Sequence, residues 1–256
     1  MCARQIAVLL PPSKGKADDD PAISSVPYAR TLTNTDPLAG PRRVVLDALL
    51  SSPTTLSREA KMRLYGVGEA GLLAADQQQA ALDVAPTRPA RERYRGVVYT
   101  NAGLGDRTVD HPKVTIFIVS AVLGLVELDT PVPNYRVEFG AKLPPIGSLS
   151  RFWAAACRNY LLERLAGVEV WNLLPNEHRS ILDGCADQLD VIDVRFVTPS
   201  GARANTARSK VAKGHIVATL RREGPLSAKT FAALDPLAPD WTFHAVGKTL
   251  TGVCHL

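Results

Sequence analysis

An apolar run from Val114 to Val119, followed by a proline-rich polar loop, is the feature that most constrains the fold of this 256-residue chain. The run has the length of a strand and is rich in β-branched residues, which is typical of a strand buried on both faces. Small residues between Ser120 and Leu125 then allow another backbone to come close. The stretch therefore predicts a buried sheet at the centre of the fold.

The loop after this run contains four prolines and three side chains suited to a polar site. The prolines are at positions 131, 133, 144 and 145, and the polar side chains are Tyr135, Arg136 and Glu138. Because proline fixes φ, such a loop is stiff and holds its side chains in place. A stiff loop at the end of a strand is a common place for a binding or catalytic site. We expect Glu138 and Tyr135 to take part in chemistry and Arg136 to bind an anion.

The stretch resembles the YaaA family of peroxide stress proteins, where it reads roughly LSGLYG-L-RPLD-I-PYRLEMG…L…FW. Residues 9–16, 94–104, 170–177 and 207–220 resemble further family segments. The resemblance implies a cytosolic protein that binds DNA and helps cells to survive peroxide. In the central segment, the matching residues of this chain are Ser120, Gly124, Leu125, Leu128, Asp129, Pro133, Tyr135, Arg136, Glu138, Gly140, Leu143, Phe152 and Trp153.

The whole pattern predicts an α+β (mixed α/β) fold, in which helices flank a mixed β-sheet. Apolar segments predict strands over residues 5–10, 168–174 and 191–198, and a closing strand pair over 241–253. Helical periodicity covers residues 41–51, 56–65, 148–165, 204–222 and 227–234, and we expect Pro53 to end the first element. We expect a single domain over residues 1–256, with a helical insertion at about 41–85.

The insertion contains a pattern typical of a helix-hairpin-helix. Gly66-Val67-Gly68 separates two predicted helices, and its glycines allow a tight turn that exposes backbone N–H groups. N–H groups at the start of a helix can hold a DNA phosphate without reading the sequence. Arg58, Lys61 and Arg63 offer counter-charge on the first helix. An ordinary helical hairpin with a glycine turn fits the same residues.

Other polar residues follow predicted strands or form a basic helix. Ser13 and Lys14 follow the first strand, and Asn172 ends a later one. The resemblance implies that these residues, together with Tyr99 and Lys213, bind an anionic ligand. We also expect Arg208 to contact DNA and Lys210 to be a catalytic amine, since residues 208–222 form the most basic part of the chain: Arg208, Lys210, Lys213, His215, Arg221 and Arg222.

Four residues depart from the family pattern. Val97 stands where the family usually has Asp, Lys213 replaces an Arg, and Pro175 and His178 also differ. Lysine keeps the charge of arginine but loses its planar fork of donors. The departures indicate a diverged relative, in which the stress function need not be kept.

Three classes of function fit these residues. The first is DNA binding that protects against oxidative damage. The second is an enzyme acting on a nucleobase, nucleoside or nucleotide as a glycosylase, lyase or transferase, in which a lysine attacks a sugar and polar side chains line a cleft. The third is a small-molecule binder or a biosynthetic accessory protein.

Composition and charge limit the partners, the metal or cofactor content and the compartment that we expect. A net charge of +5 and a pI of about 9.1 are compatible with an anionic partner such as DNA or a nucleotide. The four cysteines have no CxxC spacing and the histidines form no metal-binding pair, so we expect reduced thiols, no metal and no cofactor. No signal peptide or membrane-spanning run is visible, and we therefore expect a cytoplasmic protein without membrane contact. The sequence gives no oligomeric state.

Overall fold

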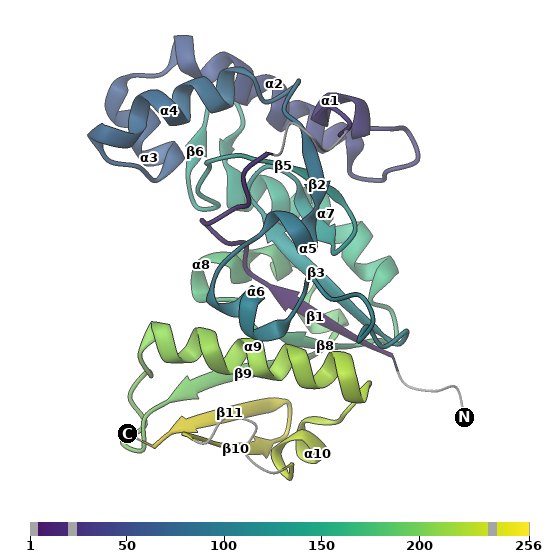
Figure 1. Cartoon of the computed structure of the whole chain (residues 1–256). Coiled ribbons are helices and arrows are strands. Elements are labelled where there is room, and N and C mark those ends of the chain that lie inside the picture. Colours follow the sequence, from purple (N-terminus) through teal and green to yellow (C-terminus); the bar gives the residue numbers. More distant parts are fainter. Residues whose placement is uncertain (1–4, 20–24, 235–239, 256) are drawn as a thin grey trace.

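The computed structural model describes residues 5–19, 25–234 and 240–255 and is built on a seven-stranded sheet, in the order β10-β11-β9-β8-β1-β3-β4 (Figure 1). Strands β3, β1, β8, β9 and β11 run parallel, whereas β4 and β10 are antiparallel edges. The predicted mixed α/β fold is confirmed. The strands are β1 (Ile6–Leu10), β3 (Val114–Ser120), β4 (Gly124–Glu127), β8 (Glu169–Asn172), β9 (Asp190–Val197), β10 (Trp241–Val246) and β11 (Thr249–Cys254).

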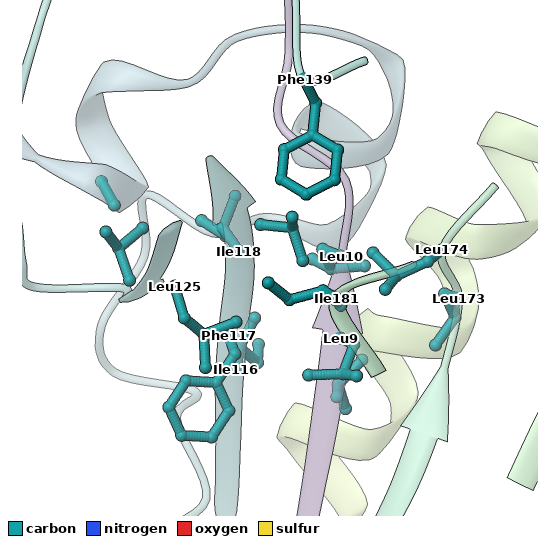
Figure 2. Packing of buried hydrophobic residues seen from close by; sticks show 14 of the residues in the cluster. Leu9, Leu10, Ile116, Phe117, Ile118, Leu125, Phe139, Leu173, Leu174 and Ile181 are labelled. Carbon is teal, nitrogen blue, oxygen red and sulfur yellow. The ribbon is translucent and has the colours of Figure 1, made fainter. Parts of the chain in front are cut away.

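Strand β1 lies inside the sheet between β3 and β8, and all of its residues are buried. Figure 2 shows Leu9 and Leu10 of this strand packed beside Ile116 and Ile118 of β3. The chain leaves β1 to form β3 on one side and later returns to form β8 on the other. The loops after β1 and β8 therefore meet where the strand order reverses, which is the usual ligand position in parallel sheets.

Helices cover the sheet and build a group at one end. Helices α2 to α4 lie together at the top of Figure 1, far from β10 and β11 at the bottom. No described helix is both long and apolar enough to cross a membrane. The helices are α1 (Tyr28–Thr31), α2 (Ala39–Thr55), α3 (Arg58–Tyr65), α4 (Glu69–Ala80), α5 (Ala90–Arg93), α6 (Val97–Ala102), α7 (Leu149–Arg164), α8 (Asn176–Arg179), α9 (Thr206–Glu223) and α10 (Ala228–Ala232).

Short elements complete the fold. Strand β2 (Thr87–Pro89) pairs with β5 (Pro131–Pro133), and this pairing joins the segment after α4 to the proline-rich loop. Strands β6 (Lys142–Leu143) and β7 (Gly147–Ser148) form a second small sheet. Two 3-10 turns, Ser180–Leu182 and Ala186–Gln188, lead from α8 toward β9.

The first long helix is longer than the predicted range of residues 41–51. Helix α2 continues through Pro53 to Thr55. Proline cannot donate to the carbonyl four residues earlier, which here belongs to Leu49. The Ser52 hydroxyl donates to that carbonyl instead, at 2.8 Å. The side chain before the proline thus satisfies the acceptor that proline leaves open.

Trp153, one of the residues that match the family segment, is a core residue. It is fully buried in α7, and its Nε1 donates to the carbonyl oxygen of Ala121 at 2.8 Å. The small residues after β3 therefore pack against the indole ring of Trp153, whereas the sequence predicted that another backbone would come close to them. Since the ring is enclosed, it is not a platform for stacking a base.

Helix α9 packs closely on α6 at Gly214. A Cβ added there would lie 2.4 Å from the Cβ of Asn101 and 2.9 Å from the carbonyl oxygen of Val98. We expect Gly214→Ala to lower the free energy of unfolding by about 1–3 kcal/mol, because overpacking outweighs the better helix propensity of alanine. Urea unfolding measures this difference.

Gly40→Ala is the matched control. Gly40 also lies in a helix, α2, but an added Cβ would meet no atom within 4 Å. Its substitution should leave stability unchanged or raise it by up to about 1 kcal/mol. Equal effects of the two variants would contradict the close helix contact.

Candidate functional site

Side chains from two loops and two helices gather at the carboxyl edge of the parallel strands. They come from the segment after β1, the loop after β5, α8 and α9. Helices α3 and α8 and the start of α9 lie on the left of Figure 1, where the arrow of β1 points. We call the group the carboxyl-edge cluster, and its members are Lys14, Lys16, Tyr135, Arg136, Glu138, His178 and Lys213.

Glu138 joins this cluster to the helical group. Its Oε1 lies 2.5 Å from the Nζ of Lys14, and its backbone N–H donates to the carbonyl of Leu64 at 2.8 Å. Its side chain also fills the space beside Gly66, since a Cβ added to that glycine would lie 1.9 Å from Oε1. Glu138 therefore contacts both the loop after β1 and the end of α3.

The predicted glycine turn between two helices is present. Gly66 follows α3 with φ of 60°, Gly68 is the N-cap of α4, and Val67 packs on the core. Two of the expected cations on α3 are already paired: Arg58 contacts Glu69, and Lys61 lies 2.6 Å from Asp76. Arg63 remains exposed. The use of this turn as a DNA-binding hairpin stays a prediction. Fewer unpaired cations lie near the turn than the sequence suggested.

Buried hydroxyl groups form a chain behind the cluster. The Tyr135 hydroxyl lies 2.9 Å from Ser120 Oγ and 2.9 Å from the Tyr94 hydroxyl. Burial raises the pKa of Tyr94 and Tyr135, so both hydroxyls stay protonated at neutral pH. Tyr99 is also buried, and its hydroxyl donates to the carbonyl of Pro11 at 2.8 Å. These contacts favour a positioning role for the tyrosines.

Lys16 lies in the cluster although the sequence pointed to Lys14. Its Nζ lies 4.1 Å from the ring centre of Tyr135 and donates to the carbonyl of Ser13 at 3.1 Å. Burial, followed by the charges of Arg136 and Arg93, lowers the pKa of Lys16 to about 7. A substantial fraction of this amine is therefore neutral under physiological conditions.

Two buried nitrogen atoms of the cluster have no hydrogen-bond partner among the described residues. They are Nε of Arg136 and Nδ1 of His178. The His178 ring stacks on Phe139 with centroids 5.0 Å apart, and Figure 2 shows Phe139 pointing toward the carboxyl ends of β1 and β3. Burial lowers the pKa of His178 to about 4, with Glu138 opposing and Lys213 adding to this effect. His178 is thus a neutral ring at neutral pH.

The basic residues of α9 do not form one surface. Lys213 reaches the cluster, where its Nζ donates to the carbonyl of Leu173 at 2.5 Å and burial lowers its pKa to about 8. Lys210 is exposed, and Arg208 is exposed with one nitrogen 3.6 Å from the sulfur of Cys254. Arg221, however, is fully buried, so this member of the basic part of the chain does not face an anionic partner.

Ser13 and Asn172 lie at the edge, but their polar atoms already have partners. The Ser13 hydroxyl donates to the carbonyl of Arg95. The Asn172 amide donates to Asp193 at 3.0 Å, and its oxygen accepts from the N–H of Leu174 at 3.1 Å. These hydrogen bonds indicate that Ser13 and Asn172 fix the shape of the loops after β1 and β8. Direct ligand binding by either residue stays a prediction.

A hollow of about 580 Å³ lies between α3 and the loop after β5 and shares Glu138 with the cluster. Its wall is mostly apolar, with Arg63, Glu138 and Lys142 as its charged members. It is large enough for a nucleobase or a small nucleoside. The lining residues are Leu56, Ala60, Arg63, Leu64, Glu138, Gly140, Ala141, Lys142 and Pro144.

The sequence profile of a family described as peroxide stress protein YaaA matches residues 6–238. This span includes the sheet strands from β1 to β9, all seven residues of the carboxyl-edge cluster and helix α9. The chain belongs to the YaaA family.

Curated relatives of this YaaA-family chain carry the name UPF0246 protein. One from Rickettsia bellii (strain OSU 85-389) is 27% identical over 132 residues, which are 48% of this chain and 53% of the relative. One from Corynebacterium glutamicum (strain ATCC 13032) is 30% identical over 99 residues, 38% of each chain. One from Corynebacterium efficiens is 28% identical over 162 residues, 63% of this chain and 62% of the relative. The chain spans about half the length of the Rickettsia relative that it matches.

The departures from the YaaA pattern concentrate near the site. His178 and Lys213 belong to the carboxyl-edge cluster, and Pro175 accepts a hydrogen bond from the His178 N–H at 2.9 Å. Val97 is the first residue of α6 and is 43% exposed. The departures thus change side chains around the edge, while β1 and β3 keep their buried apolar pattern.

Thiols of this YaaA-family chain are poor candidates for direct reaction with peroxide. Cys157, Cys185 and Cys254 are free and buried, while Cys2 lies outside the described residues. Burial raises the pKa of Cys157 to about 12 and also raises that of Cys185. Because the thiolate is the reactive form, these two groups react slowly. In the described part of the chain, no three metal-ligating side chains gather.

Proposed function

We propose that the chain is a DNA-binding member of the peroxide stress family, in which the glycine turn and the carboxyl-edge cluster form one nucleic-acid surface. The observation that carries this proposal is the position of Glu138. It contacts Leu64 and Gly66 of the turn and pairs with Lys14 of the cluster. A strand held by N–H groups at the turn would thus run directly past the cluster.

Few phosphates are neutralised in this arrangement. Arg58 and Lys61 are paired within the helical group, which leaves Arg63 there and Lys210 and Arg208 at the start of α9. Each phosphate contact contributes a slope of about −0.9 in log Kobs against log salt. We therefore expect a shallow slope of about −2 to −4 for duplex DNA, on the basis of the same relation. A series of anisotropy titrations at increasing salt measures it.

Substituting each turn glycine in turn tests whether DNA binding depends on the geometry of the turn or only on the positive charge of the protein. Gly66→Ala places a Cβ against Glu138 at a positive φ, whereas a Cβ on Gly68 meets no atom within 4 Å. We expect Gly66→Ala to weaken duplex binding about tenfold, equivalent to about 1.4 kcal/mol. Gly68→Ala should change binding less than threefold. Binding to duplex, mismatched and single-stranded DNA is compared at one salt concentration, with thermal stability measured in parallel.

Binding that is absent at low salt would contradict this proposal. So would equal effects of Gly66→Ala and Gly68→Ala in two variants that remain folded. Protection from oxidative damage is part of the proposal, and peroxide survival of cells carrying Gly66→Ala in place of the natural chain tests that part.

A second candidate is an enzyme or binder acting on a nucleobase, nucleoside or nucleotide. It is favoured by the unpartnered Nε of Arg136 and by the hollow beside Glu138. A phosphate or carbonyl oxygen would satisfy the Arg136 N–H. Nucleotides should then raise the melting temperature of the natural chain, and Arg136→Lys should remove this rise. No shift with any nucleotide would exclude the candidate.

A further inference from the structure

Lys16 has the surroundings of a nucleophilic amine. Ion pairs between described residues do not include it, and its Nζ is instead held by the carbonyl of Ser13. The amine lies above the Tyr135 ring and 5.7 Å from the centre of the Tyr94 ring. An ammonium or iminium ion is stabilised by the face of an aromatic ring. The position thus suits a nitrogen that alternates between a neutral and a cationic form.

The groups around Lys16 provide both charge repulsion and a proton acceptor. Arg136 and Arg93 disfavour the ammonium form, while Glu138 favours it to a smaller extent. Arg93 itself is buried, paired with Asp19 and bonded to the carbonyl of Val132. Burial beside other cations is the arrangement that makes a lysine nucleophilic near neutral pH. The Glu138 carboxylate is half-exposed, so that water can reach it.

Lys16 is not among the lysines that the sequence singled out, which are Lys14, Lys210 and Lys213. Lys210 is exposed, and the Nζ of Lys213 is held at 2.5 Å by the carbonyl of Leu173. Lys14 is largely exposed and paired with Glu138. Lys16 alone among these four lies over an aromatic ring of the cluster, within the electrostatic reach of Arg136, whose Nε has no partner among the described residues.

We infer that Lys16 forms an imine with the aldehyde of a phosphorylated deoxyribose, with Arg136 holding the phosphate. The lone pair of Nζ attacks the aldehyde carbon, and the carbonyl oxygen takes up a proton to give a carbinolamine. Loss of that hydroxyl as water then leaves a C=N bond. Glu138 is placed to give and take these protons, and hydrolysis by water restores the amine and the aldehyde.

The same sugar aldehyde has two sources. It is free in deoxyribose 5-phosphate, and it is part of the strand at an abasic site in DNA. In the second case the imine acidifies the neighbouring carbon, so that loss of a proton breaks the C–O bond to the 3′ phosphate and cuts the strand. Only this second arm rests on the proposed DNA binding.

Borohydride trapping tests the inference. The full chain is incubated with deoxyribose 5-phosphate or with an oligonucleotide that contains one abasic site, reduced with borohydride, digested and examined by mass spectrometry. We expect the reduced adduct on the peptide that contains Lys16, with a trapping rate that rises around pH 7. Lys16→Arg should lower the yield at least tenfold, and Lys248→Arg, in an exposed turn, should leave it unchanged.

The two probes, the free sugar phosphate and the abasic oligonucleotide, distinguish the Lys16 imine from the proposed DNA binding. Trapping by the free sugar phosphate without trapping by DNA supports the amine and contradicts the DNA surface. Adducts spread over exposed lysines, adducts on Lys213, or no adduct with either probe would overturn the inference. Because the natural chain is mapped directly, this outcome does not depend on the folding of the Lys16→Arg variant.

Discussion

Arg221→Met should lower the free energy of unfolding by about 3–5 kcal/mol, because it leaves several backbone carbonyls without their donor, at about 1–3 kcal/mol for each buried group. The Arg221 guanidinium is buried and lies 2.7 Å from Asp110. It also donates to the carbonyls of Ala102 and Gly103, at 2.6 and 2.8 Å, and to that of Asp106. Methionine has similar length but no donor, so these acceptors would lose their partners.

Arg222→Met is the control for this experiment. Arg222 is the next residue on α9, but its side chain is more than half exposed, and among the described residues it forms an ion pair only with its neighbour Glu223. Its loss should change stability by less than about 0.5 kcal/mol. Urea unfolding of both variants gives the comparison. A small effect of Arg221→Met would contradict the inference that the buried Arg221 side chain holds α9 against the loop after α6.

Lys16→Met should make the chain more stable at neutral pH. The pKa of Lys16 falls from its ordinary 10.5 to about 7 in the folded state, chiefly through burial. Between these values the unfolded chain binds more protons, so the stability of the natural chain rises with pH from about 7 to about 10.5. Removal of the amine should therefore raise the free energy of unfolding at pH 7 by about 2–3 kcal/mol, below the upper bound set by the full pKa change.

The pH dependence distinguishes this effect from simple repacking. The advantage of Lys16→Met over the natural chain should shrink as the pH rises toward 10, because the unfolded natural chain then begins to lose the proton that the folded chain has already lost. Lys248→Met, at an exposed site, should follow the natural chain at every pH. Urea unfolding between pH 7 and 10 measures the three curves. A variant that is less stable than the natural chain at pH 7 would show that the amine is not strained by burial.

Local pattern was enough to predict the sheet and to place several residues of the candidate site near strand ends. The apolar runs at Ile6–Leu10 and Val114–Ser120 form neighbouring buried strands, because their composition leaves few alternatives. Glu138 and Lys14, each singled out after a strand or in the stiff loop, do meet, at 2.5 Å. Spacing along the chain could indicate that both lie near strand ends, but not that Glu138 would contact Gly66.

The missed features depend on partners that are distant in sequence. Lys16 is enclosed because its backbone bridges to Tyr94 and its amine lies over Tyr135. A signal was present in the sequence, since alternation places Lys14 and Lys16 on one side of an extended segment. Arg221 is buried by carbonyls of residues 102–106, more than a hundred positions away. No helical pattern in α9 identifies these acceptors.

Hydrogen–deuterium exchange with and without a short duplex tests most directly whether the turn and the cluster form one DNA surface. At saturating DNA and low salt, we expect slower exchange in residues 66–70 and in the loops after β1 and β8. Strands β10 and β11, at the far end of the molecule in Figure 1, should be unchanged. Protection confined to those strands, or no protection while DNA is bound, would contradict the account.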